Sequence, residues 1–196
     1  MEIKNNMADN MDYLRIFIAT FFENDAENLV KPLLYLDEET ALSLRKVLPE
    51  KIHLTWKFLG DFSASKTKEL IEKVDESAKL IEQTSLNMTA LEIWPNRKRP
   101  RQIVITSNER SSTINSFYNT LEDGLFKLDI AKESRKFNPH ITLARFKKNT
   151  KCNRPILQLL ENFIPQSLYI NNVNIVQSTL SSKGSDYKIL YNIPIK

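Results

Sequence analysis

Cysteine is almost absent from this chain of 196 residues, and long apolar runs are missing altogether. The single cysteine, Cys152, excludes an internal disulfide and fits a reducing compartment. No apolar run approaches the roughly 18 residues that a membrane span requires, and the first residues lack the apolar core of a secretory signal. The sequence therefore predicts a cytoplasmic protein with no membrane partner.

The overall composition is that of a soluble globular protein, with 41% hydrophobic and 27% charged residues. A chain of this length can form one full core or two small lobes, but not several independent domains. Residues 1–12 are polar and show no periodicity, so we expect a disordered leader there. We expect residues 13–196 to form a single bilobal domain that acts as a monomer.

Histidine occurs only twice, and both copies open the same motif, His-apolar-Thr-apolar. The motifs are His53-Leu54-Thr55-Trp56 and His140-Ile141-Thr142-Leu143. Two imidazoles around one substrate can act as general acid and general base, because both titrate near neutral pH. A single motif of this kind could be a structural histidine in a strand, but two copies that hold every histidine argue against it. A structural zinc site needs three or four ligands, so we predict no metal.

Apolar and polar residues alternate through the first motif, which is typical of a half-buried strand. We expect His53, Thr55 and Lys57 on one face, and the core on the other face to hold Ile52, Leu54, Trp56 and Phe58. Side chains two apart on one strand face lie roughly 6.5–7 Å apart, so an imidazole and a hydroxyl can bind one tetrahedral anion. Lys57 would then lie beside that anion if it is a phosphate. The same alternation, continued from His140 and Thr142 of the second motif, puts Phe146 on the face of the histidines, where it could stack a base; alternatively it belongs to the core.

Hydrophobic periodicity and chain breakers predict the remaining elements. Strands are expected at 13–22, 52–60, 86–94, 102–107, 139–147, 168–181 and 186–194, and helices at 25–46, 65–83, 111–127 and 155–163. The helical segment 25–46 should break near Leu36, Gly60 should close the first histidine strand, and Lys183-Gly184 should form the last turn.

The predicted elements repeat in the order strand, helix, histidine strand, helix, strands. His140 follows His53 by 87 residues, and the same offset carries Ile103 in one predicted strand to Leu190 in the last. We therefore predict two similar lobes whose His-Thr pairs face each other across a central cleft.

Basic residues gather beside both motifs. Residues 97–101 form a basic loop, and Lys132, Arg135 and Lys136 precede His140. Such clusters suit a partner that carries phosphate. The alternative for each cluster is a solvated turn.

Longer phrases around both motifs resemble the 2H phosphoesterase superfamily, in particular its RNA 2′,3′-cyclic phosphodiesterases, also called 2′-5′ RNA ligases. These phrases are Leu14–Ala19, Ile52–Gly60, Arg99–Arg101, Phe137–Arg145, Ser178–Leu180 and Tyr187. The resemblance implies a bilobal, duplicated α+β fold with two antiparallel sheets, outer helices and a central cleft carrying both His-x-Thr motifs. The segment 33–47 departs from the family by being longer.

The resemblance also implies hydrolysis of RNA 2′,3′-cyclic phosphate ends, or of cyclic nucleotides, to 2′-phosphomonoesters without metal or cofactor. His53 would be the proton donor and His140 the proton acceptor, although the two motifs are chemically equivalent in the sequence itself. Thr55, Thr142 and Arg145 would bind the phosphate, and Arg99 and Arg101 would lie near the RNA.

Arg145 is the one residue for which pattern and resemblance disagree. Strict alternation from His140 places Arg145 on the face opposite the cleft, where it would form an outer salt bridge. A bulge in the strand would reconcile its position with phosphate binding.

Three other activities remain open from the sequence. The same site run in reverse can join a cyclic phosphate end to a 5′-hydroxyl as a 2′-5′ linkage. A second enzymatic alternative is a phosphodiesterase acting on 2′-5′ oligoadenylate. The non-enzymatic alternative is a module that binds a nucleotide or RNA end, which two titrating histidines disfavour.

Overall fold

The computed structural model describes residues 13–108, 111–182 and 184–195. The predicted leader at 1–12 and Lys183 of the last predicted turn lie outside the described residues. The strands are β1 Tyr13–Phe21, β2 Leu44–Lys46, β3 His53–Ser63, β4 Thr84–Met88, β5 Ala90–Trp94, β6 Gln102–Thr106, β7 His140–Phe146, β8 Gln166–Ile170, β9 Asn172–Ser181 and β10 Gly184–Pro194. The α-helices are α1 Ala26–Val30, α2 Glu38–Leu42, α3 Thr67–Ala78, α4 Ser112–Phe126 and α5 Arg154–Glu161.

Four of the predicted segments have wrong boundaries. The segment 25–46 forms α1, a 3₁₀ turn that follows it directly, and α2, and extended Leu36 separates the turn from α2 as predicted. The end of the segment is not helical, because it forms strand β2. Gly60 does not close the histidine strand, because its φ of 69° lets β3 continue to Ser63. The long strands predicted at 86–94 and 168–181 each form two strands, one of which joins a separate sheet.

The predicted α+β fold with duplicated, antiparallel sheets and outer helices is confirmed. Eight strands form one sheet in the order β10-β9-β1-β3-β7-β6-β5, with β2 paired to β7, and β4 and β8 form a second, two-stranded sheet. The main sheet has two halves that meet at β3 and β7. Among the described residues, the ladder between these two strands consists of Leu54 opposite Ile141. The two lobes are therefore halves of one sheet, joined at the residues that follow the two histidines.

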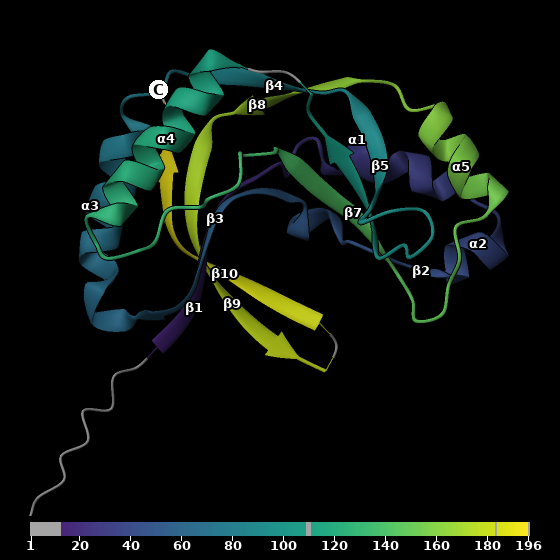
Figure 1. Cartoon of the computed structure of the whole chain (residues 1–196), viewed down its shortest axis with the longest axis horizontal. Coiled ribbons are helices and arrows are strands. Elements are labelled where there is room, and N and C mark those ends of the chain that lie inside the picture. Colours follow the sequence, from purple (N-terminus) through teal and green to yellow (C-terminus); the bar gives the residue numbers. More distant parts are fainter. Residues whose placement is uncertain (1–12, 109–110, 183, 196) are drawn as a thin grey trace, which may run out of the picture.

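The two repeats exchange strands across this junction. Outward from the junction, the first half runs β3, β1, β9 and the second runs β7, β6, β5. Because β5 comes from the first repeat and β9 from the second, each half is completed by a strand of the other. The helices follow the same rule, since α3 and α4 lie together at one end of the molecule and α1, α2 and α5 at the other (Figure 1).

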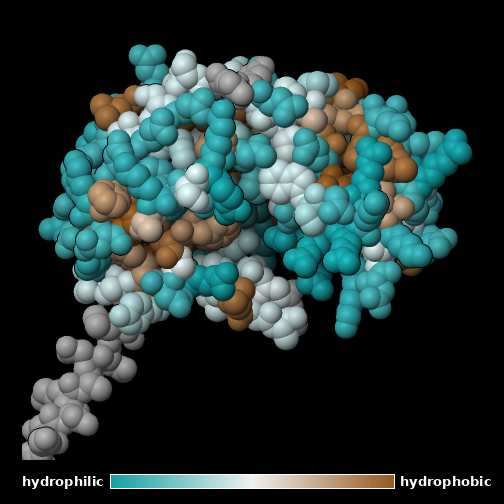
Figure 2. Space-filling view, viewed as in Figure 1, coloured by the Kyte–Doolittle hydropathy of each residue, from teal (hydrophilic) through white to brown (hydrophobic). Residues whose placement is uncertain are grey.

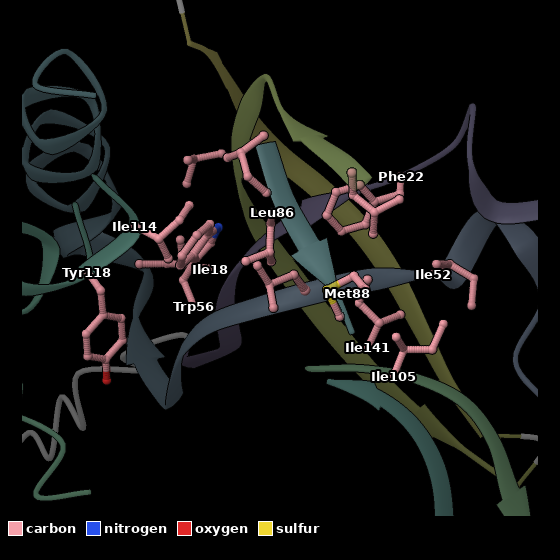
Figure 3. Close-up of a cluster of buried hydrophobic side chains, with 14 of the residues drawn as sticks. Ile18, Phe22, Ile52, Trp56, Leu86, Met88, Ile105, Ile114, Tyr118 and Ile141 are labelled. Carbon is pink, nitrogen blue, oxygen red and sulfur yellow. The ribbon is translucent and has the colours of Figure 1, made fainter. Parts of the chain in front are cut away.

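One hydrophobic core runs beneath both halves of the sheet. Leu86 and Met88 of β4 are fully buried between Ile18 of the first half and Ile141 of the second (Figure 3). The predicted apolar face of α4 is buried as well, comprising Ile114, Phe117, Tyr118, Leu121 and Leu125. This shared core holds the two histidine strands in a fixed relation.

Candidate active site

Both histidines make the same hydrogen bond to the backbone. Nδ1 of His53 lies 2.7 Å from the carbonyl oxygen of Lys51, and Nδ1 of His140 lies 3.0 Å from that of Asn138. Since a carbonyl only accepts, each Nδ1 carries the proton and donates. The neutral imidazole then has a free Nε2 that can accept a proton, and the imidazolium can donate one from the same atom. Each histidine opens its strand, so the accepting carbonyl comes from the turn just before it.

The junction of the two half-sheets brings the four motif residues together. Leu54 and Ile141 are opposite each other and point into the core. Extending this antiparallel register by one residue in each direction puts His53 beside Thr142 and Thr55 beside His140, all on the other face. Directly opposed residues have Cβ atoms about 4.5–5.5 Å apart. The predicted meeting of the two His-Thr pairs is thus a consequence of the strand register.

Aromatic rings surround His53. The ring centroids of Phe17 and Phe21 lie 5.2 Å from that of His53, and the ring of Tyr187 lies 5.3 Å away, edge-on. Burial lowers the pKa of His53, and the charges of Arg145 and His140 lower it further, whereas the hydrogen bond that Nδ1 donates to the Lys51 carbonyl raises it. The influence of Arg145 and His140 on this pKa reflects how close the two half-sites lie.

Trp94 packs against the second histidine. Its ring centroid lies 4.5 Å from that of His140, and its Nε1 donates to Oε2 of Glu92 at 2.7 Å. The other oxygen of Glu92 accepts from Oγ1 of Thr106 at 3.1 Å, and Thr106 is opposite His140 in the sheet. Glu92 thus fixes the tryptophan against the imidazole.

Sequence reasoning did not identify the rings around the histidines. Phe17 and Phe21 occupy alternate positions of a strand that is buried on both faces, so period-two alternation gives no signal there. Trp94 ends a predicted strand, and its position directly before the basic loop is the one signal in the sequence for a role at the site.

A bulge follows each histidine by three residues. In the pairing of β3 with β1, Trp56 has no opposite residue between Thr55 and Lys57. In the pairing of β7 with β6, Leu143 is skipped in the same way between Thr142 and Ala144. A bulge shifts the strand by one residue, so the side chains that follow it change face. In β3 this holds as far as Leu59, which a second register shift skips.

The second bulge places Arg145 on the cleft face. Arg145 is opposite Gln102, and its Nη1 donates to Oε1 of Gln102 at 3.0 Å. The bulge that would reconcile pattern and resemblance is therefore present. The alternative of an outer salt bridge is not what the structure has.

The same bulges correct three predicted orientations. Lys57 does not face the cleft: its Nζ lies 2.8 Å from Oε1 of Glu122 on the helix side, with both side chains buried. Phe58, predicted in the core, is 67% exposed and lies 5.7 Å from Phe17 on the cleft face. Phe146, predicted on the cleft side, packs against the core. Lys57 is therefore turned away from the predicted phosphate position. For Phe146 the sequence left stacking and the core open, and the structure has it at the core.

Two cavities border the second histidine strand, and Figure 2 shows hydrophilic side chains around the hollow between the two halves. One cavity, of about 790 Å³, includes Thr55, Trp94 and His140. The other, of about 540 Å³, is lined by Trp94, Pro95, Arg101, Gln102 and Arg145. Of the two arginines predicted at the RNA, Arg101 therefore lies beside Arg145. Arg99 is exposed in the turn that Asn96 Oδ1 holds by accepting its backbone N–H at 3.0 Å.

Comparison with known proteins places the chain in a family. The family model of the LigT-like phosphoesterases matches twice, at residues 26–104 and 105–186, which is most of the chain and corresponds to the two repeats. A protein of Aquifex aeolicus named RNA 2′,3′-cyclic phosphodiesterase is 25% identical over 92% of this chain and 96% of its own length. A protein of the same name from Archaeoglobus fulgidus is 25% identical over 90% of this chain and 98% of its own.

Solved structures share the fold. A protein of Thermus thermophilus superposes with a TM-score of 0.75 at 22% identity, covering 93% of this chain and 98% of its own. Escherichia coli LigT, in a crystal structure with 3′-AMP, superposes with a TM-score of 0.71 at 19% identity, covering 94% of this chain and 99% of its own.

No helix among the described residues is long and apolar enough to cross a membrane.

Proposed function

Because this chain belongs to the LigT-like phosphoesterase family, we propose that it hydrolyses the 2′,3′-cyclic phosphate at the end of an RNA strand to a 2′-phosphomonoester. Relatives that carry the name RNA 2′,3′-cyclic phosphodiesterase support this substrate class. The observation that carries the proposal is the pair of imidazoles whose Nδ1 atoms are bonded alike, which leaves two Nε2 atoms for one substrate.

The proposed reaction is an in-line displacement at phosphorus. His140 Nε2 takes a proton from water as the water oxygen bonds to phosphorus, and the bond from phosphorus to O3′ breaks. His53 Nε2 gives its proton to the departing O3′, which becomes a hydroxyl. The reaction needs one imidazole that holds a proton and one that is free to accept a proton, and imidazole can do either because its charge changes within the physiological pH range. The products are a 2′-phosphomonoester and a 3′-hydroxyl.

The negative charge that develops on the phosphoryl oxygens needs donors already in position. We assign this task to the hydroxyls of Thr55 and Thr142 and to the guanidinium of Arg145. Thr55 and Thr142 share a sheet face with the histidines, and the bulge brings Arg145 to that face. Because Arg145 already bonds to Gln102, part of its side-chain ordering precedes substrate binding.

The basic loop is proposed to attract RNA rather than to react. Arg99 and Arg101 belong to an exposed, cationic turn, and Arg101 lines the cavity beside Arg145. Neutralising Arg97, Lys98 and Arg99 should raise KM for a long oligonucleotide and reduce the slope of its salt dependence by about one for each phosphate that the loop no longer binds. A salt slope equal to that of the unchanged protein would make the loop a solvated turn.

Product analysis tests the proposal against its alternatives. Incubation with 2′,3′-cyclic nucleotides and short RNAs should give 2′-phosphate ends with rates that survive EDTA. Shortened 2′-5′ oligoadenylate would favour that second phosphodiesterase activity, and bound but unchanged ligand would favour a binding module. Joining of a cyclic phosphate end to a 5′-hydroxyl strand at high RNA concentration would reveal the reverse reaction.

A further inference from the structure

The free edge of β3 is covered differently from that of β7. In the second half, β2 pairs with Ala144–Phe146 of β7. The two histidines are 87 residues apart, so equivalent positions of the two repeats differ by 87. The equivalent of β2 is therefore residues 131–133, and the equivalent of Ala144–Phe146 is residues 57–59. Residues 131–133 form no strand. The first half therefore lacks the strand that closes the equivalent edge of the second.

Side chains hold the segment 131–133 at a distance from β3. Lys57 Nζ donates to the carbonyl of Ala131 and to Oε2 of Glu122, both at 2.9 Å. The same Oε2 accepts from the backbone N–H of Glu133 at 2.8 Å. The buried side chains of Lys57 and Glu122 thus lie between β3 and the segment 131–133, where backbone hydrogen bonds would join two paired strands. A groove therefore stays open between β3 and the segment.

This groove opens onto the reaction centre. It is the cavity of about 790 Å³ that holds Thr55 and His140, and its walls are residues 55–59 of β3 and residues 130–138. Its volume lies within the range of roughly 300–1,000 Å³ that is usual for small-ligand sites.

The groove offers the two features that bind a nucleotide. Phe58 presents a largely exposed ring, and Phe17 supports it from behind. An exposed aromatic ring can stack any nucleobase. The opposite wall carries the cations Lys132, Arg135 and Lys136. Lys132 pairs with Asp123 and Arg135 pairs with Glu133 at 3.2 Å, so Lys136 leaves this wall with a net positive charge, which favours a phosphodiester.

A second cavity near His53 has the opposite character. It measures about 580 Å³, and Phe21, whose ring contacts His53, forms part of its wall. Its charged lining residues are Glu23 and Asp25, and the rest of its polar lining consists of amides and Tyr169. Carboxylates repel a phosphodiester, so of these two cavities the first groove is the one that favours an RNA strand leaving the reaction centre.

We propose that the groove between Phe58 and residues 131–136 binds the nucleotide on the 5′ side of the cyclic phosphate. Its base stacks on Phe58, and the phosphate that links it to the terminal nucleotide lies beside Arg135 and Lys136. This rests on the proposed function and narrows it, because it makes an RNA end a better substrate than a free cyclic mononucleotide.

The test compares kcat/KM for a 2′,3′-cyclic mononucleotide with that for a dinucleotide ending in the same cyclic nucleotide. The unchanged protein should prefer the dinucleotide. Phe58→Ala should reduce this preference by about tenfold, and Phe58→Tyr should keep it. Arg135→Ala with Lys136→Ala should reduce it and flatten its salt dependence. The matched control, Lys68→Ala with Arg154→Ala, removes one lysine and one arginine from α3 and α5 and should keep the preference.

The outcomes separate this proposal from the proposed function. Equal kcat/KM for the two substrates, or an unchanged preference in both groove variants, would overturn the groove while leaving the phosphodiesterase intact. A loss in the control as large as in the groove variants would reduce the effect to net charge and overturn it as well. No hydrolysis of either substrate by the unchanged protein would overturn the proposed function and the groove together.

Discussion

At the scale of single residues, the two histidines share a backbone bond but differ in their surroundings. Three aromatic rings enclose His53, whereas Trp94 and an open groove border His140. Equal bonds at Nδ1 give both rings the same tautomer, so environment rather than tautomer distinguishes them. Two consequences of the lowered pKa of His53 can be measured.

The first consequence concerns stability. The pKa of His53 is lower in the folded protein than its unfolded value near 6.5, so the unfolded state binds more protons between the two values. His53 should therefore lower the free energy of unfolding as the pH falls through 6.5 towards the folded pKa. In urea unfolding, the free energy of unfolding should fall less between pH 7.5 and pH 5.5 in His53→Gln than in the unchanged protein. An equal loss in the two proteins would contradict the assigned burial.

The second consequence concerns the pH profile of kcat/KM. If His53 is the proton donor, kcat/KM should fall as the pH rises through its lowered pKa, which places the optimum on the acidic side of about 6.5. A rate that instead rises with pH through this pKa and stays high at neutrality would make His53 the base and His140 the acid.

The threonines of the two motifs should affect the rate and leave the fold intact. Loss of one donor to a developing anion costs on the order of 3 kcal/mol in transition-state stabilisation, and we expect less from a hydroxyl that shares its task. Thr55→Ala and Thr142→Ala should each lower kcat, while Thr→Ser at the same positions should restore most of it. Lower melting temperatures with unchanged kcat would return the threonines to a role in strand formation.

At the scale of secondary-structure elements, the paired bulges decide which side chains reach the cleft. Without them Lys57 would point at the substrate and Arg145 away from it, as strict alternation predicts. The bulges exchange these positions, so that Arg145 joins the site and Lys57 joins Glu122 beneath the sheet. Arg145 and Phe58 occupy equivalent positions, 87 residues apart. The bulges therefore bring a cation to the cleft face in the second half and an aromatic ring in the first.

The buried Lys57–Glu122 pair links β3, α4 and the segment before His140. Removing one partner leaves a buried charge, which costs about 3–5 kcal/mol, whereas replacing both by apolar groups costs much less. Lys57→Met should therefore lower the free energy of unfolding more than Lys57→Met with Glu122→Leu. Urea unfolding of the unchanged protein, the single variant and the double variant checks this. A free energy of unfolding that is lower in the double variant than in Lys57→Met would show that the two side chains do not act as a pair.

At the scale of the whole molecule, the sequence predicted the parts that depend on pattern. Two His-x-Thr motifs on half-buried strands, the offset of 87 residues and the helix faces gave two lobes and their meeting point. The sequence could not give the skipped residues Trp56 and Leu143, because a bulge changes the period without changing residue type. It also could not give the exchange of β5 and β9, which depends on partners distant in the chain.

In the proposed mechanism, both histidines serve one cyclic phosphate as a unit. The most direct measurement is the rate of 2′-phosphate formation from a 2′,3′-cyclic nucleotide by His53→Ala, His140→Ala and the double variant. Each single change should cost about 10²–10⁴ in kcat, and the double variant should be little slower than either single, because the missing partner disables both. Full activity in either single variant, or losses that multiply in the double, would contradict it.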